Sequence, residues 1–438
     1  MLEKPIARFR SRKNFVETRT GSKIKRSTSQ KPLEDLESLF NSCKKSRRFH
    51  WSASGPPFQG GAVGYLSYEA LHYLENVPLP DTDDVHAPWM DFSFFDSGVA
   101  FDHWEKKFHV FGPKEKTNGL KIRFQILLEE LRHPAKVSGQ TGKIASNFSK
   151  SAYVQAIGAI QERIASGETF QANLSQRFYA KTSKTPWNVF VRLNQINPSP
   201  YSAFFQSGDL ALASASPELL FSIQDGTIVT RPIAGTRPRG KTAHGDRRLE
   251  KDLVDNAKEN AEHAMLVDLE RNDVGRICRP GSVVVQNGFL VEKYSHVQHL
   301  VSQVKGRLNP EKNAFDAIRA LFPGGTITGC PKVRTMRILR EVEPVARGPY
   351  SGSLGWIGWN GDAAFNILIR TIYFKREKTK NDGLKINKKA SSPKSRDSAS
   401  LWSAYFHAGG GIVYDSRPQK EYEESLQKAK AMKLALSP

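Results

Sequence analysis

The spacing of apolar positions changes from helical to strand-like near residue 168. Between residues 149 and 168, Val154, Ile157, Ile160 and Ile164 recur on one helical face, and Gly167 is a typical stop signal. Apolar runs of strand length follow at 172–181, 201–208, 210–223 and 227–236. These patterns predict a helix followed by a series of strands, the last two joined by a tight Gln-Asp-Gly turn.

The remainder of the chain repeats this grouping of like elements. A long helix is predicted over 246–275, strands over 353–374 and 403–414, and a closing helix over 421–436. Strands and helices segregate rather than alternate strictly. We therefore predict an α+β fold with two large antiparallel sheets and helices outside them, rather than a doubly wound parallel sheet.

The first third of the chain is less regular. Short strands with one helical turn are predicted over 58–110, then a helix over 120–134 and a Gly/Ser-rich connector. This gives three regions with different expected roles: a basic, polar and poorly ordered segment at 1–50, a strand-rich part at 51–148, and a main catalytic region at 149–438.

The net charge of +21 raises the alternative of a basic nucleic-acid-binding protein. Much of the excess lies in the first fifty residues and in a Lys/Ser/Asn-rich stretch at 375–400. The second stretch is almost free of apolar residues between two strand signals, which is typical of a basic loop insertion. No base-stacking aromatic residues alternate with its lysines, so the composition favours a solvated loop over a nucleic-acid interface.

The lack of a recognisable targeting signal and the spacing of the cysteines favour a cytoplasmic protein. No apolar run is long enough for a membrane span, and the N-terminal residues lack the apolar core of a secretory signal. The three cysteines have neither metal nor disulfide spacing. We therefore expect a reducing compartment and no membrane partner.

The stretch FPGGTITGCPK at 322–332 has the glycine spacing of a phosphate loop but lacks its lysine-serine/threonine pair. Cys330 and Pro331 follow the second glycine, and a proline has no amide hydrogen to donate to a phosphate. Gly325 and the neighbouring glycines still indicate close approach by a ligand or by other backbone.

Two predicted helices carry candidate metal-binding carboxylates. Glu262 follows Glu259 within one helical turn, and Glu421, Glu424 and Lys428 share one face of the last helix. Acidic residues near a helix start are usually surface charges that compensate the dipole. The alternative is a Mg²⁺ site, since Mg²⁺ takes one or two carboxylates together with substrate oxygens and water.

Two further features favour an anionic substrate. Arg370 ends an apolar strand, and its planar fork matches a carboxylate. Gly409, Gly410 and Gly411 let backbone amides approach an anion. With Thr326 these residues predict a pocket for a small substrate that carries more than one carboxylate.

At this point the motifs resemble a known family, the chorismate-utilising enzymes, which include component I of aminodeoxychorismate synthase and of anthranilate synthase. The similar stretches run in family order over more than half of the chain. They are GGAVGYLSYE, GETFQANLSQR, SASPELL, RPIAGTRPRG, AEHAMLVDLERNDVGR, YSHVQHLVS, GGTITGCPKVRTM, RGPYSGSLGW, ILIRT and AGGGIVYDSRPQKEYEESLQKA.

The resemblance implies a single layered body rather than independent domains, with Mg²⁺ as cofactor and chorismate as substrate. It implies that Glu262 and Glu424 bind Mg²⁺, with Glu421 near them. Arg370 and Tyr350 would hold the enolpyruvyl carboxylate. The residues implied on the side of the ring carboxylate are Gly325, Thr326, Gly409, Gly410, Gly411 and Lys428.

The resemblance also implies the reacting groups. Glu218 resembles the general acid for loss of the C4 hydroxyl, and His299 resembles the histidine beneath the ring. Relatives that add water to chorismate carry a lysine base where this chain has Gln171. Because an amide cannot deprotonate water, ammonia is the expected nucleophile.

Two amination products stay open. Aminodeoxychorismate synthases commonly carry a lysine where this chain has Ala234, as anthranilate synthases do. Against this, TITG and FNILIRT are closer to the aminodeoxychorismate pattern, and the feedback motif LLES is missing. The expected reaction is amination of chorismate at C4 for para-aminobenzoate and folate synthesis, with anthranilate formation as the alternative.

The ammonia is expected to come from a separate glutamine amidotransferase subunit. Glutamine hydrolysis needs an activated cysteine on a nucleophile turn, and the surroundings of Cys43, Cys278 and Cys330 do not have that sequence. The chain also has no stretch left over for an added amidotransferase domain. We expect the isolated chain to use free ammonia only.

Overall fold

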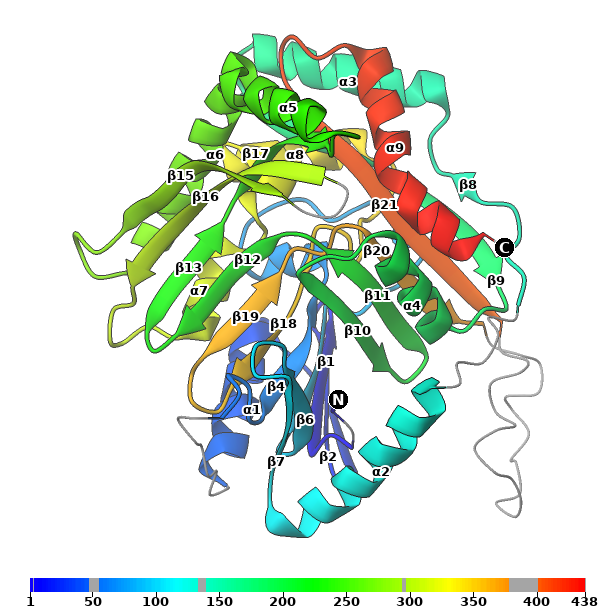
Figure 1. Cartoon of the computed structure of the whole chain (residues 1–438), viewed down its shortest axis with the longest axis vertical. Helices are drawn as coiled ribbons and strands as arrows, with labels where there is room; N and C mark the ends of the chain where they lie inside the picture. The colour runs from blue at the N-terminus through cyan, green and yellow to red at the C-terminus, as the bar shows by residue number, and fades with distance from the viewer. Residues whose placement is uncertain (3, 47–54, 133–138, 294–296, 378–400, 438) are drawn as a thin grey trace. The chain divides into compact units, whose positions relative to one another are not determined.

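Three separate chain segments come together in each of the two units of the structure (Figure 1). The structure is a computed structural model and describes residues 1–2, 4–46, 55–132, 139–293, 297–377 and 401–437. Unit 1 comprises Met1–Ala135, Glu218–Arg337 and Val345–Ile367, and unit 2 comprises Lys136–Pro217, Ile338–Pro344 and Leu368–Pro438. The predicted boundary at residue 148 does not divide these units, because the chain beyond it contributes to both.

Unit 1 contains an antiparallel sheet of twelve strands among the described residues. They are β1 (Ala7–Arg12), β2 (Phe15–Thr20), β3 (Lys23–Thr28), β4 (Gly61–Leu66), β5 (Met90–Phe95), β12 (Leu219–Gln224), β13 (Thr227–Arg231), β14 (Ile233–Pro238), β15 (Val284–Lys293), β16 (Val297–Arg307), β18 (Ser353–Gly358) and β19 (Ala363–Asn366). Their order is β14-β16-β13-β12-β19-β18-β4-β5-β1-β2-β3, and β15 also pairs with β16. Strands from three chain segments thus form one surface.

Shorter elements and helices complete unit 1. The hairpin β6 (Gly98–Asp102) and β7 (Lys107–Phe111) forms a separate sheet, and β17 covers Gly329–Cys330. The helices are α1 (Pro32–Lys45), η1 (Tyr68–Tyr73), α2 (Lys114–Arg132), α5 (Ala243–Asp255), α6 (Ala257–Gly275), α7 (Ala314–Leu321) and η2 (Gly325–Ile327), while α8 (Lys332–Val342) runs from unit 1 into unit 2.

The N-terminal segment was predicted to be poorly ordered, and the structure shows that this is wrong for residues 7–45. β1 alternates buried and half-buried positions, with Ala7 and Phe9 in the core, and Phe9 lies opposite Phe92 of β5. In α1, Phe40 stacks on Trp359 with ring centroids 4.9 Å apart. The basic composition hid a period-2 pattern in which Ala7, Phe9 and Ser11 form the buried face of β1.

The helix predicted over 246–275 is two helices, α5 and α6. Asn256 lies between them with extended backbone, and its side chain accepts a hydrogen bond of 3.0 Å from the Glu259 amide. Asparagine is among the best helix N-cap residues because its side-chain oxygen satisfies an amide of the first turn. The cap therefore begins a new helix where the apolar spacing predicted continuity.

Unit 2 contains the second antiparallel sheet. Its strands are β8 (Ala145–Ser146), β9 (Gln171–Thr182), β10 (Tyr201–Ser207), β11 (Leu210–Ser216), β20 (Thr371–Arg376) and β21 (Trp402–Ile412). The order is β10-β11-β20-β21-β9, and β8 also pairs with β9. The run predicted as a strand over 210–223 is interrupted at Pro217, which has no amide hydrogen for a ladder bond, so β11 ends before it and β12 begins after it.

Three helices pack on the unit 2 sheet: α3 (Lys150–Ala165), α4 (Pro186–Ile196) and α9 (Pro418–Leu436). Figure 1 shows α9 lying along β21. Alanines of the two elements, Ala404 and Ala408 on β21 with Ala429 and Ala435 on α9, belong to one buried cluster. Small side chains let the helix approach the strand closely, which fixes the polar face of α9 relative to the sheet.

These observations confirm the predicted fold class of large antiparallel sheets with helices. The basic insertion predicted at 375–400 falls mostly outside the described residues, and the other basic segment contributes the paired strands β2 and β3. In the part of the chain that is described, no helix combines the length and the apolar character needed to cross a membrane.

The first prediction concerns Glu69 of η1, which is fully buried and accepts a hydrogen bond from the Gly348 amide at 3.2 Å. Burial raises the pKa of this carboxyl from 4.5 to about 7. At a pH between 4.5 and about 7, Glu69 keeps its proton in the folded protein but has lost it in the unfolded chain. The free energy of unfolding therefore falls as pH rises through this range. Glu69→Gln should raise the free energy of unfolding at pH 8 by about 1–3 kcal/mol and change it little at pH 4.5.

Urea denaturation at the two pH values measures this difference. Glu75→Gln, which replaces a half-buried carboxylate on the same segment, serves as the control for removing a negative charge there. An equal effect of Glu69→Gln at both pH values would contradict the prediction.

Candidate functional site

Glu218 lies where the chain enters the unit 1 sheet. It directly precedes β12, is 5% exposed, and its carbonyl accepts a hydrogen bond of 3.0 Å from the Ile367 amide. The interruption at Pro217 thus puts a buried carboxyl at the end of a strand. A strand end holds its backbone rigidly, which is what the positioning of a catalytic group requires.

His299 lies on β16 and is buried, and its Nδ1 is 3.4 Å from the Gly235 carbonyl oxygen. Gly235 has a φ of +58°, which a glycine adopts without strain. A Cβ at this position would lie 2.5 Å from Oε2 of Glu259, so the β14 backbone packs closely on α6. Ala234, beside Gly235, is buried opposite Leu300.

Helix α6 presents two of the carboxylates singled out in the sequence. Glu259 forms an ion pair of 2.7 Å with Arg237, which also binds Asp252. Glu262 lies half-buried further along the helix. The next residue, His263, is fully buried against Ser302, and burial lowers its pKa to about 4, so it is neutral at physiological pH. The ion pair with Arg237 makes Glu259 a poor metal-ligand candidate.

The stretch 322–332 forms a compact loop that contains η2. Within it, the Thr328 hydroxyl donates to the Gly324 carbonyl at 2.9 Å. Gly325 is buried against α6, where a Cβ would come 2.4 Å from the Leu269 side chain, and Thr326 is half-buried. Close packing of the loop on α6 therefore requires a glycine at position 325, independently of any ligand.

Tyr350 is connected to this loop through a buried arginine. The Arg347 guanidinium donates to the Ile327 carbonyl at 2.9 Å and to the Ser351 hydroxyl at 3.1 Å. Its carbon lies 5.8 Å from the centroid of the Tyr350 ring. Sequence reasoning did not select Arg347, because an arginine beside a glycine is an ordinary surface pattern.

In unit 2, the glycine run lies on β21 opposite β9. Gly409, Gly410 and Gly411 face Ser175, Leu174 and Asn173 in the antiparallel register, and Gln171 begins β9 as a buried residue. A Cβ on Gly409 would lie 2.0 Å from the Leu174 carbonyl oxygen. This glycine is therefore required by strand pairing itself.

Gly410 faces the polar side of α9. A Cβ built on it would lie 3.5 Å from Lys428 Nζ, 3.7 Å from Glu421 Oε2 and 3.7 Å from Glu424 Oε1. Lys428 and Glu424 form an ion pair of 2.8 Å, and the Ser416 hydroxyl donates to Glu421 at 2.8 Å. The structure thus brings together four residues that the sequence assigned to one site. Ser416 was missed, because nothing in its local sequence marks it.

Arg370 precedes β20 with a φ of +50°, an uncommon backbone conformation for a residue with a side chain. Its guanidinium donates to the Asn197 side chain at 3.2 Å, and its carbonyl accepts from the Ala215 amide at 3.1 Å. Such conformations persist where the surroundings enforce them and are concentrated at functional sites. Asn197 was not selected either, since an asparagine before Pro-Ser-Pro is typical of a helix end.

No metal-holding group of three His, Cys, Asp or Glu side chains occurs among the described residues. Mg²⁺ needs only one or two carboxylates with substrate oxygens and water, so the absence of such a group does not decide against it. Of the predicted ligands, Glu421 and Glu424 lie on unit 2 and Glu262 lies on unit 1.

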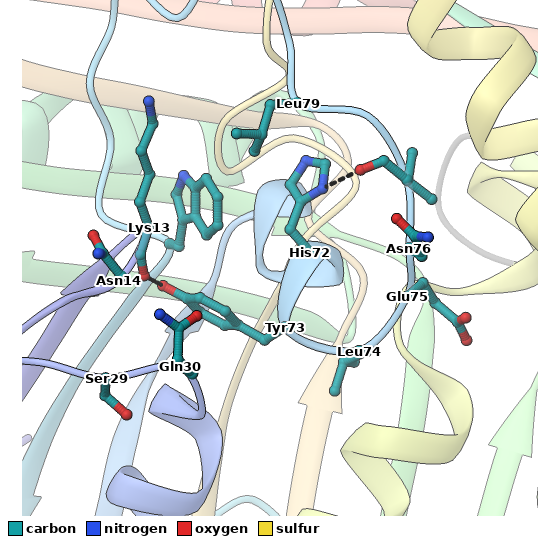
Figure 2. Close-up of a pocket in the computed structure, with 12 residues that line it drawn as sticks. Lys13, Asn14, Ser29, Gln30, His72, Tyr73, Leu74, Glu75, Asn76 and Leu79 are labelled. Atoms are coloured by element: carbon teal, nitrogen blue, oxygen red, sulfur yellow. Dashed lines mark hydrogen bonds between the residues drawn. The ribbon is translucent and has the colours of Figure 1, made fainter.

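The cavity in Figure 2 is separate from these residues. It has a volume of about 650 Å³ and is formed by the turn after β1, residues 29–30 and η1 with the segment that follows it. Tyr73 donates to the Lys13 carbonyl at 2.6 Å, and His72 Nδ1 lies 2.9 Å from the Val77 carbonyl (Figure 2). None of the predicted site residues lines it.

Comparisons with known proteins agree with these features. The family of chorismate binding enzymes matches residues 5–434, and the chain belongs to this family. It is 42% identical to aminodeoxychorismate synthase component 1 of Bacillus subtilis over 92% of this chain and 82% of that protein. It is 35% identical to anthranilate synthase component 1 of Acetivibrio thermocellus over 97% of this chain and 83% of that protein.

A solved structure agrees with the fold. The crystal structure of anthranilate synthase component I from Streptococcus pneumoniae matches with a TM-score of 0.80 and 32% identity, covering 99% of this chain and 91% of that one. The family resemblance found in the sequence is thereby confirmed.

The second prediction separates two neighbouring glycines. Gly409→Ala should destabilise the protein by about 1–3 kcal/mol, because its Cβ meets the backbone of β9, whereas Gly410→Ala should be tolerated because its Cβ makes ordinary contacts with side chains. Thermal unfolding of the two variants measures the difference. Equal losses of stability would contradict the geometry described for β21.

Proposed function

We propose that this chain is component I of an aminodeoxychorismate synthase. It would replace the C4 hydroxyl of chorismate with ammonia and give 4-amino-4-deoxychorismate, the precursor of para-aminobenzoate in folate synthesis. The observation that carries this proposal is the 42% identity to the Bacillus subtilis protein over 92% of the chain. The TITG and FNILIRT stretches support the same product.

The proposed chemistry uses residues with matching local structure. Glu218, buried at a strand end, would donate a proton to the leaving hydroxyl, and His299 would lie beneath the ring. Arg370 and Tyr350 would hold the enolpyruvyl carboxylate. The backbone of the three glycines at 409–411 and the residues Gly325, Thr326 and Lys428 would bind the ring carboxylate. Gln171, a buried amide, would favour ammonia over water.

Mg²⁺ is the proposed cofactor. Glu262 and Glu424 would bind it, with Glu421 beside them, and the ion would neutralise the charge of the substrate carboxylate. The Ser416 hydroxyl supports Glu421, since its hydrogen bond orients the carboxylate. The pair Lys428–Glu424 is half-exposed, so Glu424 can exchange this partner for a cation at low cost.

Anthranilate formation is the second candidate, and Ala234 favours it. The aminodeoxychorismate enzymes commonly place a lysine nucleophile at this position, whereas this chain has a buried methyl group there. For the proposed aminodeoxychorismate product, the alanine at position 234 means that ammonia would attack C4 directly, without a covalent intermediate on a lysine.

A separate glutamine amidotransferase subunit is the proposed source of ammonia. Glutamine hydrolysis needs a thiolate, and burial raises the pKa of Cys278 to about 11. Burial and the nearby carboxylates Asp268 and Asp273 also raise the pKa of Cys330. Cys43 is buried in α1. The three free cysteines fit a reducing compartment, and the cytoplasm is the proposed location.

The third prediction identifies the product and the nitrogen donor. With chorismate, Mg²⁺ and ammonium at raised pH, the purified chain should form a product that yields para-aminobenzoate only after a lyase is added. Glutamine should replace ammonium only when an amidotransferase subunit is present. Chromatography with fluorescence detection distinguishes para-aminobenzoate from anthranilate.

Glu218→Gln serves as the control and should give neither product, because an amide cannot protonate the leaving hydroxyl. Anthranilate as the sole product of the unaltered chain would support the second candidate. Turnover of glutamine by the purified chain alone would contradict the proposed need for a partner subunit.

The fourth prediction concerns the metal. Glu262→Gln and Glu424→Gln should each lower turnover at least about 10- to 100-fold and raise the Mg²⁺ concentration needed for half-maximal activity, because each change removes a charged ligand. Melting temperatures should stay close to that of the unaltered protein, since neither side chain is fully buried. Mg²⁺ titrations of the initial rate provide the measurement.

Glu423→Gln is the matched control, since this exposed carboxylate neighbours Glu424 on the same helix and has no proposed role. Unchanged Mg²⁺ dependence in Glu262→Gln or Glu424→Gln would show that the altered residue is an ordinary surface carboxylate.

A further inference from the structure

A buried carboxylate beneath the 322–332 loop has no role in the chemistry proposed so far. Glu270 lies on α6, is 4% exposed, and its Oε2 accepts a hydrogen bond of 3.0 Å from the Thr230 hydroxyl of β13. The Gly325 backbone amide lies close enough to the same carboxylate to lower its pKa. An ideal Cβ on Gly325 would lie 3.7 Å from Oε1 of Glu270, so the carboxylate is in direct reach of this backbone.

The burial of this group is energetically unfavourable. Burial raises the pKa of Glu270 to about 7, and Asp273 raises it further, whereas the nearby Lys332, the Thr230 hydroxyl and the Gly325 amide lower it. A carboxylate is a costly residue for an interior that an apolar side chain could fill. Costly buried groups are concentrated where function requires them.

Two further contacts hold the rest of the loop. Lys332 bonds to Asp273 of α6 and to the carbonyl of Leu321, which ties together the two ends of the loop. On the other side of Thr326, the Arg347 guanidinium holds the Ile327 carbonyl at 2.9 Å. Charged side chains thus contact the backbone on both sides of Thr326. Glu270 lies at the amide of Gly325, and Arg347 binds the carbonyl of Ile327.

We infer that Glu270 is a positioning residue for chorismate amination, and that it acts by holding the Gly325 amide so that Thr326 is presented to the substrate. This inference rests on the proposed function, in which Gly325 and Thr326 contact the ring carboxylate. Displacement of a contact by about 1 Å can reduce the rate about 100-fold, so an anchor one residue away controls the reaction without touching the substrate.

A double-mutant cycle between Glu270 and Thr326 tests this inference. Glu270→Leu fills a similar volume but has no hydrogen-bond acceptor. It should lower kcat/KM for chorismate about 10- to 100-fold. The loss should come mainly from a higher KM, because the ring carboxylate is bound less well. In a Thr326→Ala background the same change should have no further effect, since the group it positions is gone. Glu270→Gln keeps an oxygen acceptor for the Gly325 amide and should restore kcat/KM to within about threefold of the original value.

Asp362 provides the matched control. It is a buried carboxylate of unit 1 at the turn after β18, where it accepts hydrogen bonds from the Asp225 amide and the Asn360 side chain. Asp362→Leu should affect the melting temperature but leave kcat/KM of the folded protein unchanged in both backgrounds. If Glu270→Leu does not fold, Thr230→Val removes the hydroxyl that orients Glu270 and should give a smaller loss that also disappears with Thr326→Ala.

The outcomes separate the inference from the proposed function. Additive losses for Glu270→Leu and Thr326→Ala, or failure of Glu270→Gln to restore activity, would overturn the positioning role while leaving chorismate amination in place. A neutral Thr326→Ala variant would overturn it as well. Absence of ammonia-dependent chorismate turnover in the unaltered chain would instead reject the proposed function.

Discussion

Both units depend on backbone hydrogen bonding between strands that lie far apart in the chain. In unit 2, eleven residues of β21 pair with eleven of β9, from Trp402 opposite Thr182 to Ile412 opposite Ala172. In unit 1, β12 pairs with β19, and β1 pairs with β5. Each buried amide and carbonyl must find a partner, so these ladders fix the register of every side chain attached to them.

The candidate site residues derive their positions from these ladders. In the paired strands, a Cβ on Gly409 would meet the Leu174 carbonyl, whereas a Cβ on the next residue, Gly410, would point to Glu421, Glu424 and Lys428. The same logic applies to Glu218, whose carbonyl is fixed by the Ile367 amide just beyond β19. Rigid backbone at strand ends provides the preorganisation that polar chemistry needs.

Much of this was predictable from short-range sequence patterns. Apolar spacing predicted α3 and the strands β9 and β10, and the family motifs grouped Glu421, Glu424 and Lys428 with the glycine run. The break between α5 and α6 was not predicted, because a single capping side chain at Asn256 overrode a continuous apolar pattern.

Residues that support the site were the hardest to find. Ser416, Asn197 and Arg347 each bond to a group distant in sequence, and no local pattern encodes such a bond. Glu270 lies in a motif that was recognised, but only the structure shows that it contacts the Gly325 amide rather than solvent. Composition was misleading for residues 7–45, where basic surface positions masked the buried face of β1.

The segmented construction of unit 2 also determines when this protein can fold during its synthesis. The ribosome releases β9 and α4 long before β21 and α9, yet Phe178 and Val189 share a core with Phe406, Met432 and Leu436. Until α9 emerges, the nascent sheet exposes the apolar face that α9 later covers. The core of unit 2 is therefore completed only after α9 has been synthesised, and until then its early strands carry an uncovered apolar face that favours aggregation.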